Sequence, residues 1–280
     1  MLVSKMYLWS TTEMWQITWR ELKDKKWSLF FYCFGSLFLI WIYAATFRSS
    51  QVGTQQLQDL VKGYPKGLQE AFGLNNLSTN TIELYLNAKN FSLIWPLIAI
   101  ILALSRAAGQ IAGEVQSGTM GLLLALPLNR WRIFVAKYTA GIFAVLVFTG
   151  ISVFGVIPLA RAYNIPSHLS ILFHAWILTS LFMLAIYSLG LMVSSWVNEK
   201  STVYVTAGII LMLSYIANIV ALISDKFNWL KYYSLFYYFD TQTVLTNGHI
   251  KLSAFAVFGV IIVVATAVAL SRFNQRDISV

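Results

Sequence analysis

The stretch GEVQSGTMGLLLALPLNRWRIFVAK, residues 113–137, decides how the chain is organised, because it combines charges, glycines and a short apolar block between two long apolar runs. Gly118-Thr119 predicts the start of a short helix over Met120–Leu126, which Pro127 ends. Such a helix is too short to cross a membrane. Its apolar side is therefore buried in the headgroup region, against the chain's own spans or in a partner's groove. The residues alone leave two interpretations open: a docking helix and a lipid-facing connector.

The composition around this stretch is that of an integral membrane protein. The 280 residues are 58% hydrophobic and 11% charged, and their mean hydropathy is +0.67, whereas a soluble domain carries about 25% charged residues. The net charge of +9 comes from Lys and Arg placed between apolar runs. In that position they orient helices against headgroups, so no nucleic-acid partner is expected. The lone Cys33 and three scattered His residues predict no metal site.

Six apolar runs predict a single all-α polytopic membrane domain over residues 1–280, since each is near the roughly 20 residues needed to cross. The predicted spans cover residues 27–47, 91–111, 133–159, 170–197, 202–223 and 252–271. The second contains Pro96, which is compatible with a kink, and its helix is expected to continue past Arg106. Residues 112–132 form the loop between spans two and three, and residues 48–90 and 224–251 form loops on the other side. A helical pattern covers Thr54–Val61, and another short helix is expected from Asn80. The aromatic loop 224–251 is expected to dip into the membrane edge.

Six spans place both termini on one side, and that side holds more of the Lys and Arg residues. The bias predicts cytoplasmic termini and a cytoplasmic loop 112–132 in a plasma or inner membrane. Trp131 and Lys137 are expected to anchor the third span at the membrane surface. Residues 1–26 predict an amphipathic helix in the headgroup plane, with a capping box at Ser10–Glu13 and with Trp15 and Trp19 as anchors.

Several kinds of chemistry are missing from the sequence. No phosphate-binding glycine loop is present, so the chain is not expected to bind ATP or to be an enzyme. No Asp or Glu falls inside a predicted span, which argues against an ion-coupled transporter. Gly190-x-x-x-Ser194 predicts close helix packing. Asn218 is the most polar residue within a span and is a candidate for a pathway or dimer contact, although helix packing is the simpler explanation.

The order of residues in the central stretch resembles the first cytoplasmic loop of ABC-2 type transporter permeases. The motif consists of Gly113-Glu114, Gly118-Thr119, Leu122-Leu123-Leu124, Pro127, Arg130 and Lys137. Arg20-Glu21-Leu22 looks like that family's amino-terminal elbow helix, and the tail with Arg272-Phe273 and Arg276-Asp277 is also similar.

The resemblance implies a permease subunit that works as a homodimer or related heterodimer with two copies of a cytoplasmic ATPase subunit, which supplies ATP and Mg. The short helix would be the coupling helix. The residues implied in docking or coupling are Glu114, Gly118, Thr119, Met120, Leu122, Leu123, Leu124, Pro127 and Arg130. The implied activity is export of a lipid, drug, peptide or other amphipathic substrate. The alternatives are an ion-gradient-driven secondary transporter or channel and a non-transport membrane scaffold.

Overall fold

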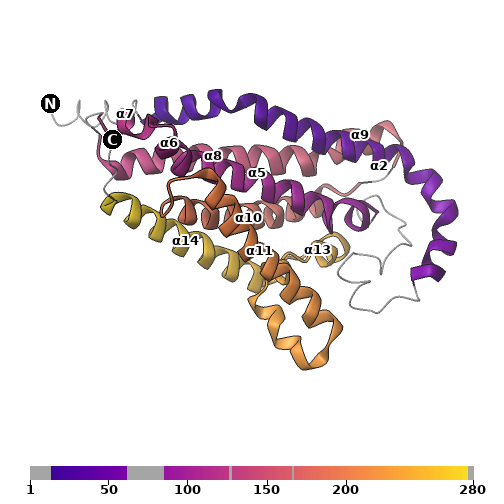
Figure 1. Cartoon of the computed structure of the whole chain (residues 1–280). Coiled ribbons are helices and arrows are strands. Elements are labelled where there is room, and N and C mark those ends of the chain that lie inside the picture. Colours follow the sequence, from indigo (N-terminus) through magenta and orange to yellow (C-terminus); the bar gives the residue numbers. More distant parts are fainter. Residues whose placement is uncertain (1–13, 62–84, 126–127, 166, 277–280) are drawn as a thin grey trace.

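The computed structural model describes residues 14–61, 85–125, 128–165 and 167–276, and every regular element within them is helical. Figure 1 shows long helices that run side by side in a bundle, with α11 leaving it at an angle. The long elements are α2 (Lys26–Val61), α5 (Ile94–Gln110), α8 (Arg130–Phe154), α10 (Leu169–Ser194), α11 (Lys200–Ile223) and α14 (Leu252–Gln275). The short ones are η2 (Asn87–Phe91), α6 (Ala112–Gln116), α7 (Thr119–Leu124), α9 (Val156–Ala162), η3 (Asp225–Tyr233), α12 (Leu235–Tyr238) and α13 (Thr241–Asn247).

Helix α10 is the centre of the bundle and packs against α5, α8, α11, α13 and α14. Its residues are apolar around most of the helix, which is typical of a helix covered by neighbours. A Cβ added to Gly190 would lie 2.9 Å from the Cβ of Ala107, so α5 and α10 approach closely there. The small-residue packing predicted at Gly190 is confirmed.

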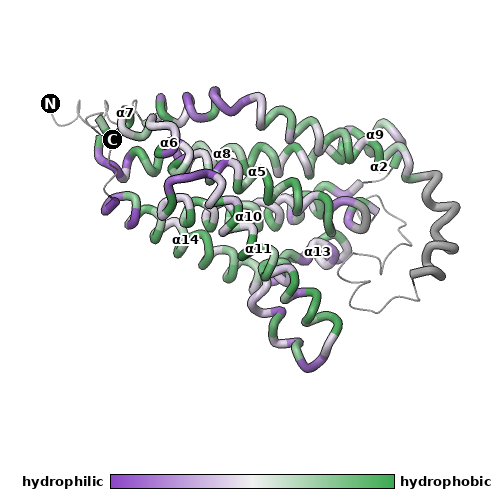
Figure 2. Tube along the Cα trace, viewed as in Figure 1, coloured by the Kyte–Doolittle hydropathy of each residue, from purple (hydrophilic) through white to green (hydrophobic). Residues whose placement is uncertain are grey.

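Within the described residues, five helical segments are long and apolar enough to cross a membrane: Lys26–Phe47 of α2, Arg130–Ala162, α10, α11 and α14. Figure 2 shows apolar residues along most of the bundle, including its outer helices. Large apolar side chains such as Phe31, Met212 and Val263 are exposed there. In a chain of this hydropathy these surfaces face lipid, so the protein is a multi-pass membrane protein.

The second predicted span corresponds to α5, which is shorter than the other candidates. Its 17 residues extend for about 26 Å at 1.5 Å per residue, against a hydrocarbon core of about 30 Å. Pro96 lies in its first turn, where a missing N–H is tolerated, and the helix continues past Arg106 as expected. The described residues thus contain five long spans and one shorter apolar helix, and a sixth crossing stays a prediction.

Some boundaries differ from the predicted ones because helix continues beyond the apolar run, as in α14, which extends to Gln275 and not only to residue 271. Helix α2 extends to Val61, so the helical pattern seen at Thr54–Val61 is a continuation of the first span and not a separate loop helix. The third span continues through α9 to Ala162. The helix expected from Asn80 and the capping box at Ser10–Glu13 lie outside the described residues.

The aromatic segment 224–251 folds into η3, α12 and α13 and is not an open loop. Its Phe239 is buried and stacks on Phe182 of α10, with ring centroids 4.2 Å apart, and on Trp95 of α5. The Leu235 N–H donates to Ser214 Oγ of α11 at 2.9 Å, which fixes the start of α12. This segment therefore closes one end of the bundle, called the α13 end below.

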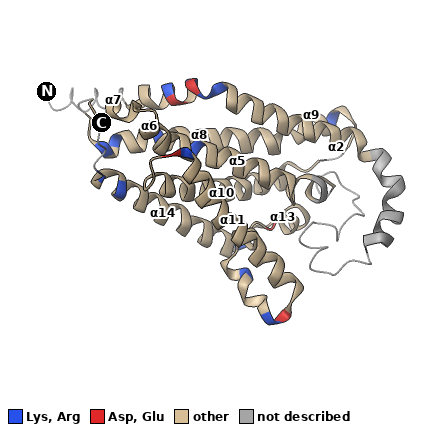
Figure 3. Cartoon of the chain, viewed as in Figure 1, with Lys and Arg blue, Asp and Glu red and all other residues tan. Residues whose placement is uncertain are grey.

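The opposite end of the bundle, the α7 end, carries α6, α7, the start of α8 and the end of α14 (Figure 1). Figure 3 shows that charged residues gather at this end and at the tip beyond α11, while the middle of the bundle is nearly free of them. The Arg276 guanidinium donates to Ser195 O at 2.9 Å and to Val197 O at 3.1 Å, so the carboxyl-terminal end of α14 is tied to the connection between α10 and α11.

Candidate functional site

The predicted coupling segment forms two short helices, α6 and α7, joined by a sharp turn at the α7 end. The first N–H of α6, from Ala112, donates to Ser194 Oγ of α10 at 3.0 Å. Gly118 separates the two helices with φ +73°, a left-handed conformation that only glycine adopts without strain. The expected helix start at Gly118-Thr119 is confirmed, and α7 ends at Leu124. Pro127 lies outside the described residues.

The residues of α7 predicted to dock a partner divide into a buried and an exposed set. Met120 is fully buried against the bundle, and Leu123 and Leu124 are half-buried against it. Leu122 has 75% of its surface exposed. Arg130 at the start of α8 donates to the Arg276 carbonyl at 2.5 Å. Met120 therefore holds α7 in place, and Leu122 is the apolar side chain that a partner can reach.

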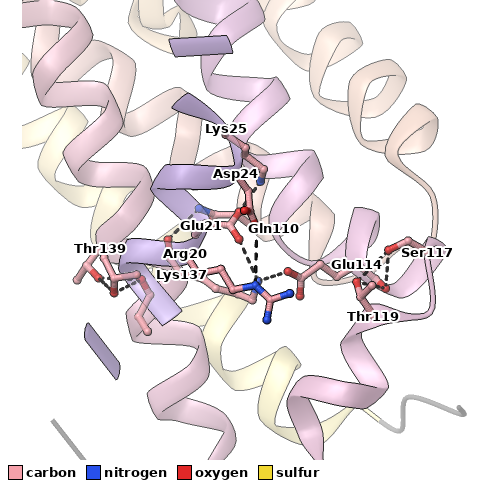
Figure 4. Close-up of polar contacts among 12 residues, drawn as sticks. Arg20, Glu21, Asp24, Lys25, Gln110, Glu114, Ser117, Thr119, Lys137 and Thr139 are labelled. Atoms are coloured by element: carbon pink, nitrogen blue, oxygen red, sulfur yellow. Dashed lines mark hydrogen bonds and ion pairs between the residues drawn. The ribbon is translucent and has the colours of Figure 1, made fainter. Parts of the chain in front are cut away.

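Lys137 is the centre of a buried ionic cluster, shown in Figure 4. Its Nζ lies 2.5 Å from Glu114 Oε1 of α6 and 3.6 Å from Glu21 Oε2. Glu21 also pairs with Lys25. The Lys137 side chain is 3% exposed, Glu21 12% and Glu114 18%. These four residues, the Lys137 junction, join α6, α8 and the helix at residues 14–24.

The helix at residues 14–24 packs along α8 and is separated from α2 only by a turn at Lys25. The Thr18 hydroxyl is buried and donates to Ala136 O of α8 at 2.9 Å. Arg106 of α5 donates to Lys25 O at 3.0 Å. The amphipathic helix is thus held on the bundle by its polar side, and its placement in the headgroup plane stays a prediction.

A chain of buried hydrogen bonds continues from the junction into the bundle. Gln110 Nε2 donates to Lys137 O at 2.8 Å, and Tyr187 OH of α10 donates to Gln110 Oε1 at 2.5 Å. Tyr187 fits there because position 141 of α8 is glycine: a Cβ at Gly141 would lie 2.0 Å from the Tyr187 hydroxyl oxygen. The end of α5, the junction and the central helix α10 are therefore in direct polar contact.

The two carboxylates of the junction have pKa values displaced in opposite directions. Burial raises the pKa of Glu114 above its ordinary value, and Lys137 offsets this only in part. Burial also acts to raise the pKa of Glu21, but Lys137 and Lys25 outweigh it, so that pKa is lowered. The pKa of Lys25 is lowered by burial. Glu21 is thus the more firmly ionised partner of Lys137, and Glu114 is the one that protonates first.

A pocket of about 510 Å³ lies between the helix at residues 14–24 and α7. Its lining includes Gln16, Ile17, Arg20, Glu21, Asp24, Glu114, Thr119, Leu122, Leu123, Leu128 and Lys137. The Glu114 Oε2 atom is buried and has no hydrogen-bond partner among the residues that the structure describes. The junction and the exposed side of α7 therefore share one concave surface.

The predicted anchors lie in different surroundings. Trp15, Trp19 and Trp131 are exposed on the surface, where a headgroup contact is possible. Lys137 is not a surface anchor, because its ammonium is buried between Glu21 and Glu114. The sequence placed it near a span end, but two carboxylates from other segments compensate its burial. Asn218 lies at the α13 end, far along the chain from the junction, and lines a second pocket.

Sequence reasoning missed four members of this site: Lys25, Arg106, Gln110 and Tyr187. The spacing of Glu21 and Lys25, four residues apart on a helix, was the one readable signal. The contacts of Arg106 with Lys25 and of Tyr187 with Gln110 join residues about 80 positions apart, and that of Gln110 with Lys137 joins residues 27 apart, so none leaves a local pattern. In the part of the chain that the structure describes, no cluster of three or more His, Cys, Asp or Glu side chains is placed to hold a metal ion.

Comparison with known proteins identifies the family of the chain. The probable multidrug ABC transporter permease YbhR of Escherichia coli (strain K12) is 25% identical over 175 residues, which are 59% of this chain and 45% of that protein. The protein of the same name in Escherichia coli O157:H7 matches equally well. The chain thus spans less than half the length of these curated relatives. The sequence profile described as ABC-2 family transporter protein matches residues 15–278. Because this match covers nearly the whole chain, the protein belongs to the ABC-2 transporter family.

Proposed function

We propose that the chain is the transmembrane subunit of an ATP-binding cassette transporter and that it exports a lipid, drug, peptide or other amphipathic substrate. Energy comes from ATP that a separate ATPase subunit hydrolyses with Mg. The observation that supports this proposal most directly is the Lys137 junction. The Glu114–Lys137 pair joins α6, and α7 behind it, to α8, and the Glu21–Lys137 pair joins α8 to the helix at residues 14–24. A force on α7 is thereby transmitted to the span-forming helix α8 and to the helix at residues 14–24, which leads into α2.

The partner in this proposal is an ATPase subunit that binds the exposed side of α7. Leu122 supplies an apolar contact, and the adjoining pocket supplies polar ones from Arg20, Asp24 and Glu114. A second permease copy pairs with the first, so that two coupling segments meet two ATPase subunits. The α7 end then lies in the cytoplasm of a plasma or inner membrane, in keeping with its Lys and Arg residues.

Within this proposal Glu114 positions α6. Its Oε1 holds Lys137, while its Oε2 has no partner among the described residues. A shift of α6 therefore alters the shortest contact of the buried Lys137 ammonium. Gln110 and Tyr187 extend the same contact to α10. Closure of the ATPase dimer would thus move α6 and α7 together, and α5, α8 and α10 would respond.

The test is co-purification of the chain with the ATPase encoded beside it, followed by ATP hydrolysis measurements in nanodiscs. We expect Leu122→Asp to weaken the complex, because it places a charge in the apolar contact. Leu252→Asp is the matched control, since Leu252 is equally exposed but begins α14 at the α13 end. If both variants retain the ATPase, or if transport runs on an ion gradient without it, the proposal is wrong.

A further inference from the structure

The second pocket, at the α13 end, has a volume of about 350 Å³ and is separate from the Lys137 junction. Helix α11 contributes Tyr215, Asn218 and Leu222, which are spaced along one side of the helix. Opposite them lie the segment from Phe236 to Thr243, the η2 region and Lys251. A pocket of this size is at the lower end of the range for small-molecule sites.

The pocket walls are fixed by hydrogen bonds between elements. Thr241 Oγ1 of α13 donates to Asn87 Oδ1 of η2 at 2.6 Å. The start of α12 is held on α11 through Ser214, as described above. The rings of Tyr215 and Phe236 meet edge to face at 5.0 Å. The site is therefore preformed, and a ligand would bind without ordering these segments first.

The charged residues of the pocket satisfy each other. Asp240 accepts hydrogen bonds from Thr243 N at 3.0 Å, from Thr243 Oγ1 at 2.6 Å and from Lys251 Nζ at 2.7 Å. Burial acts to raise the pKa of Asp240, but the bonds from Lys251 and Thr243 outweigh it and the pKa is lowered. The ionised pair is neutral as a whole, so it gives the pocket no net attraction for a cation or an anion.

Three neutral polar side chains of the lining, in contrast, have no partner among the described residues. Within the described residues, the side chains of Asn218 and Gln242 make no hydrogen bond, and the Tyr215 hydroxyl is buried without one. Two carboxamides and a phenol supply both donors and acceptors. A buried hydroxyl without a partner is energetically unfavourable, so a ligand that bonds to it is favoured.

Aromatic rings complete the lining, from Phe91, Tyr215, Phe236, Tyr237 and Phe239. The face of an aromatic ring packs well against an apolar C–H surface. The ring faces of sugars and of other hydroxylated rings offer such a surface. Just beyond the pocket, α11 exposes Met212, Leu213 and Ile216, where an alkyl chain finds an apolar surface.

We propose that this pocket binds the uncharged, hydroxyl-bearing head of an amphiphile, with hydrogen bonds to Tyr215, Asn218 and Gln242 and with its alkyl chain beside α11. As a step on a transport path, the site rests on the proposed permease function. As a binding site it does not, because all of its groups belong to this chain.

The test uses the permease alone in nanodiscs and equilibrium binding of three radiolabelled probes with the same hexyl chain: hexyl glucoside, hexyltrimethylammonium and hexyl phosphate. We expect saturable binding of the glucoside and none of the charged probes. Tyr215→Phe, Asn218→Leu and Gln242→Leu are each expected to weaken glucoside binding about three- to tenfold, the value of one neutral hydrogen bond. Asn228→Leu is the matched control, because Asn228 is exposed on η3 outside the pocket.

Three outcomes overturn the proposal: preferential binding of a charged probe, no saturable binding of the glucoside, or equal binding by the wild type and all three pocket variants. Each variant is also reconstituted with the ATPase. If the wild type forms the complex with the ATPase but binds no glucoside, the pocket proposal has failed. If it binds the glucoside but forms no complex, the permease proposal has failed.

Discussion

Lys137 is a buried cation whose position depends on two carboxylates from different segments. Removal of its charge leaves Glu21 and Glu114 facing each other in a buried site. We expect Lys137→Met to destabilise the protein by about 3–5 kcal/mol, the usual cost of breaking a buried pair from one side. The measurement is the thermal transition of the purified chain in nanodiscs.

A second substitution separates charge from packing. In Lys137→Met/Glu114→Gln one of the two uncompensated carboxylates is neutral, so part of the lost stability should return. The exposed pair Arg20–Asp24 is the control, and Arg20→Met should change the transition little because exposed pairs contribute little. Equal loss in the single and double variants would contradict the ionic assignment of the junction.

The raised pKa of Glu114 gives the junction a pH dependence. The folded protein binds the Glu114 proton more tightly than the unfolded chain, so this residue's contribution to stability falls as pH rises from about 4.5 through its raised pKa. Glu114→Gln removes the titration. We expect the stability difference between wild type and Glu114→Gln to shift in favour of the variant as pH rises through this window. Glu21, with its lowered pKa, titrates below about 4.5 and acts in the opposite direction.

The turn between α6 and α7 depends on Gly118, because its φ of +73° is unfavourable for a residue with a Cβ. No atom lies within 4 Å of an added Cβ there, so Gly118→Ala strains the backbone by about 1–2 kcal/mol without a steric clash. We expect a small loss of stability and a larger loss of substrate-stimulated ATP hydrolysis, since α7 would be reoriented. Gly208→Ala in α11 also meets open space and has no positive φ. That variant should keep both properties, and equal effects of the two substitutions would contradict the role of the turn.

The contact between α8 and α10 depends on the space that Gly141 leaves for Tyr187. Gly141→Ala places a methyl group within 2.2 Å of Tyr187 Cζ, and overpacking of this kind costs about 1–3 kcal/mol. We expect a lower thermal transition and weaker coupling, because the bond from Tyr187 to Gln110 is displaced. Gly259→Ala in α14 meets no atom within 4 Å and serves as the control. An unchanged transition in Gly141→Ala would show that the helices adjust freely at this point.

The elements that sequence patterns predict well are those with an uninterrupted apolar run. Helices α10, α11 and α14 begin within two residues of their predicted starts, because polar residues flank each run. The extension of α2 to Val61 was missed as a continuous helix, since its last part is polar and hydropathy gives no signal there. The short α7 was predicted from Gly118 and the apolar block. Its burial through Met120 was not, because that contact depends on the packing of the whole bundle.

At the scale of the whole molecule, the sequence predicts which residues share an end but not which side chains meet. Glu114 was assigned to the coupling segment, yet its bond to Lys137 and the contact of Lys137 with Glu21 require three segments to converge. The same holds for the α13 end, where an apparent loop packs Phe239 against Phe182. Both ends are closed by contacts between distant residues. Among the described residues, the charged clusters lie at the ends, while the middle of the bundle is nearly free of charged residues.

The α7 end and the α13 end of the bundle are expected on opposite sides of the membrane, and α11 runs from one towards the other. The chain is suited to a labelling test because Cys33 is its lone cysteine, is buried and is readily replaced by Ser. Ser201→Cys places a thiol at the first turn of α11 at the α7 end, and Asn228→Cys places one in η3 at the α13 end. Both original side chains are exposed.

In intact cells a membrane-impermeant maleimide should label Cys at 228 and spare Cys at 201, because the basic α7 end is expected in the cytoplasm. Permeabilised cells control for reactivity, as both sites should then react. The reverse pattern in intact cells would invert the orientation and remove the α7 surface from reach of a cytoplasmic ATPase.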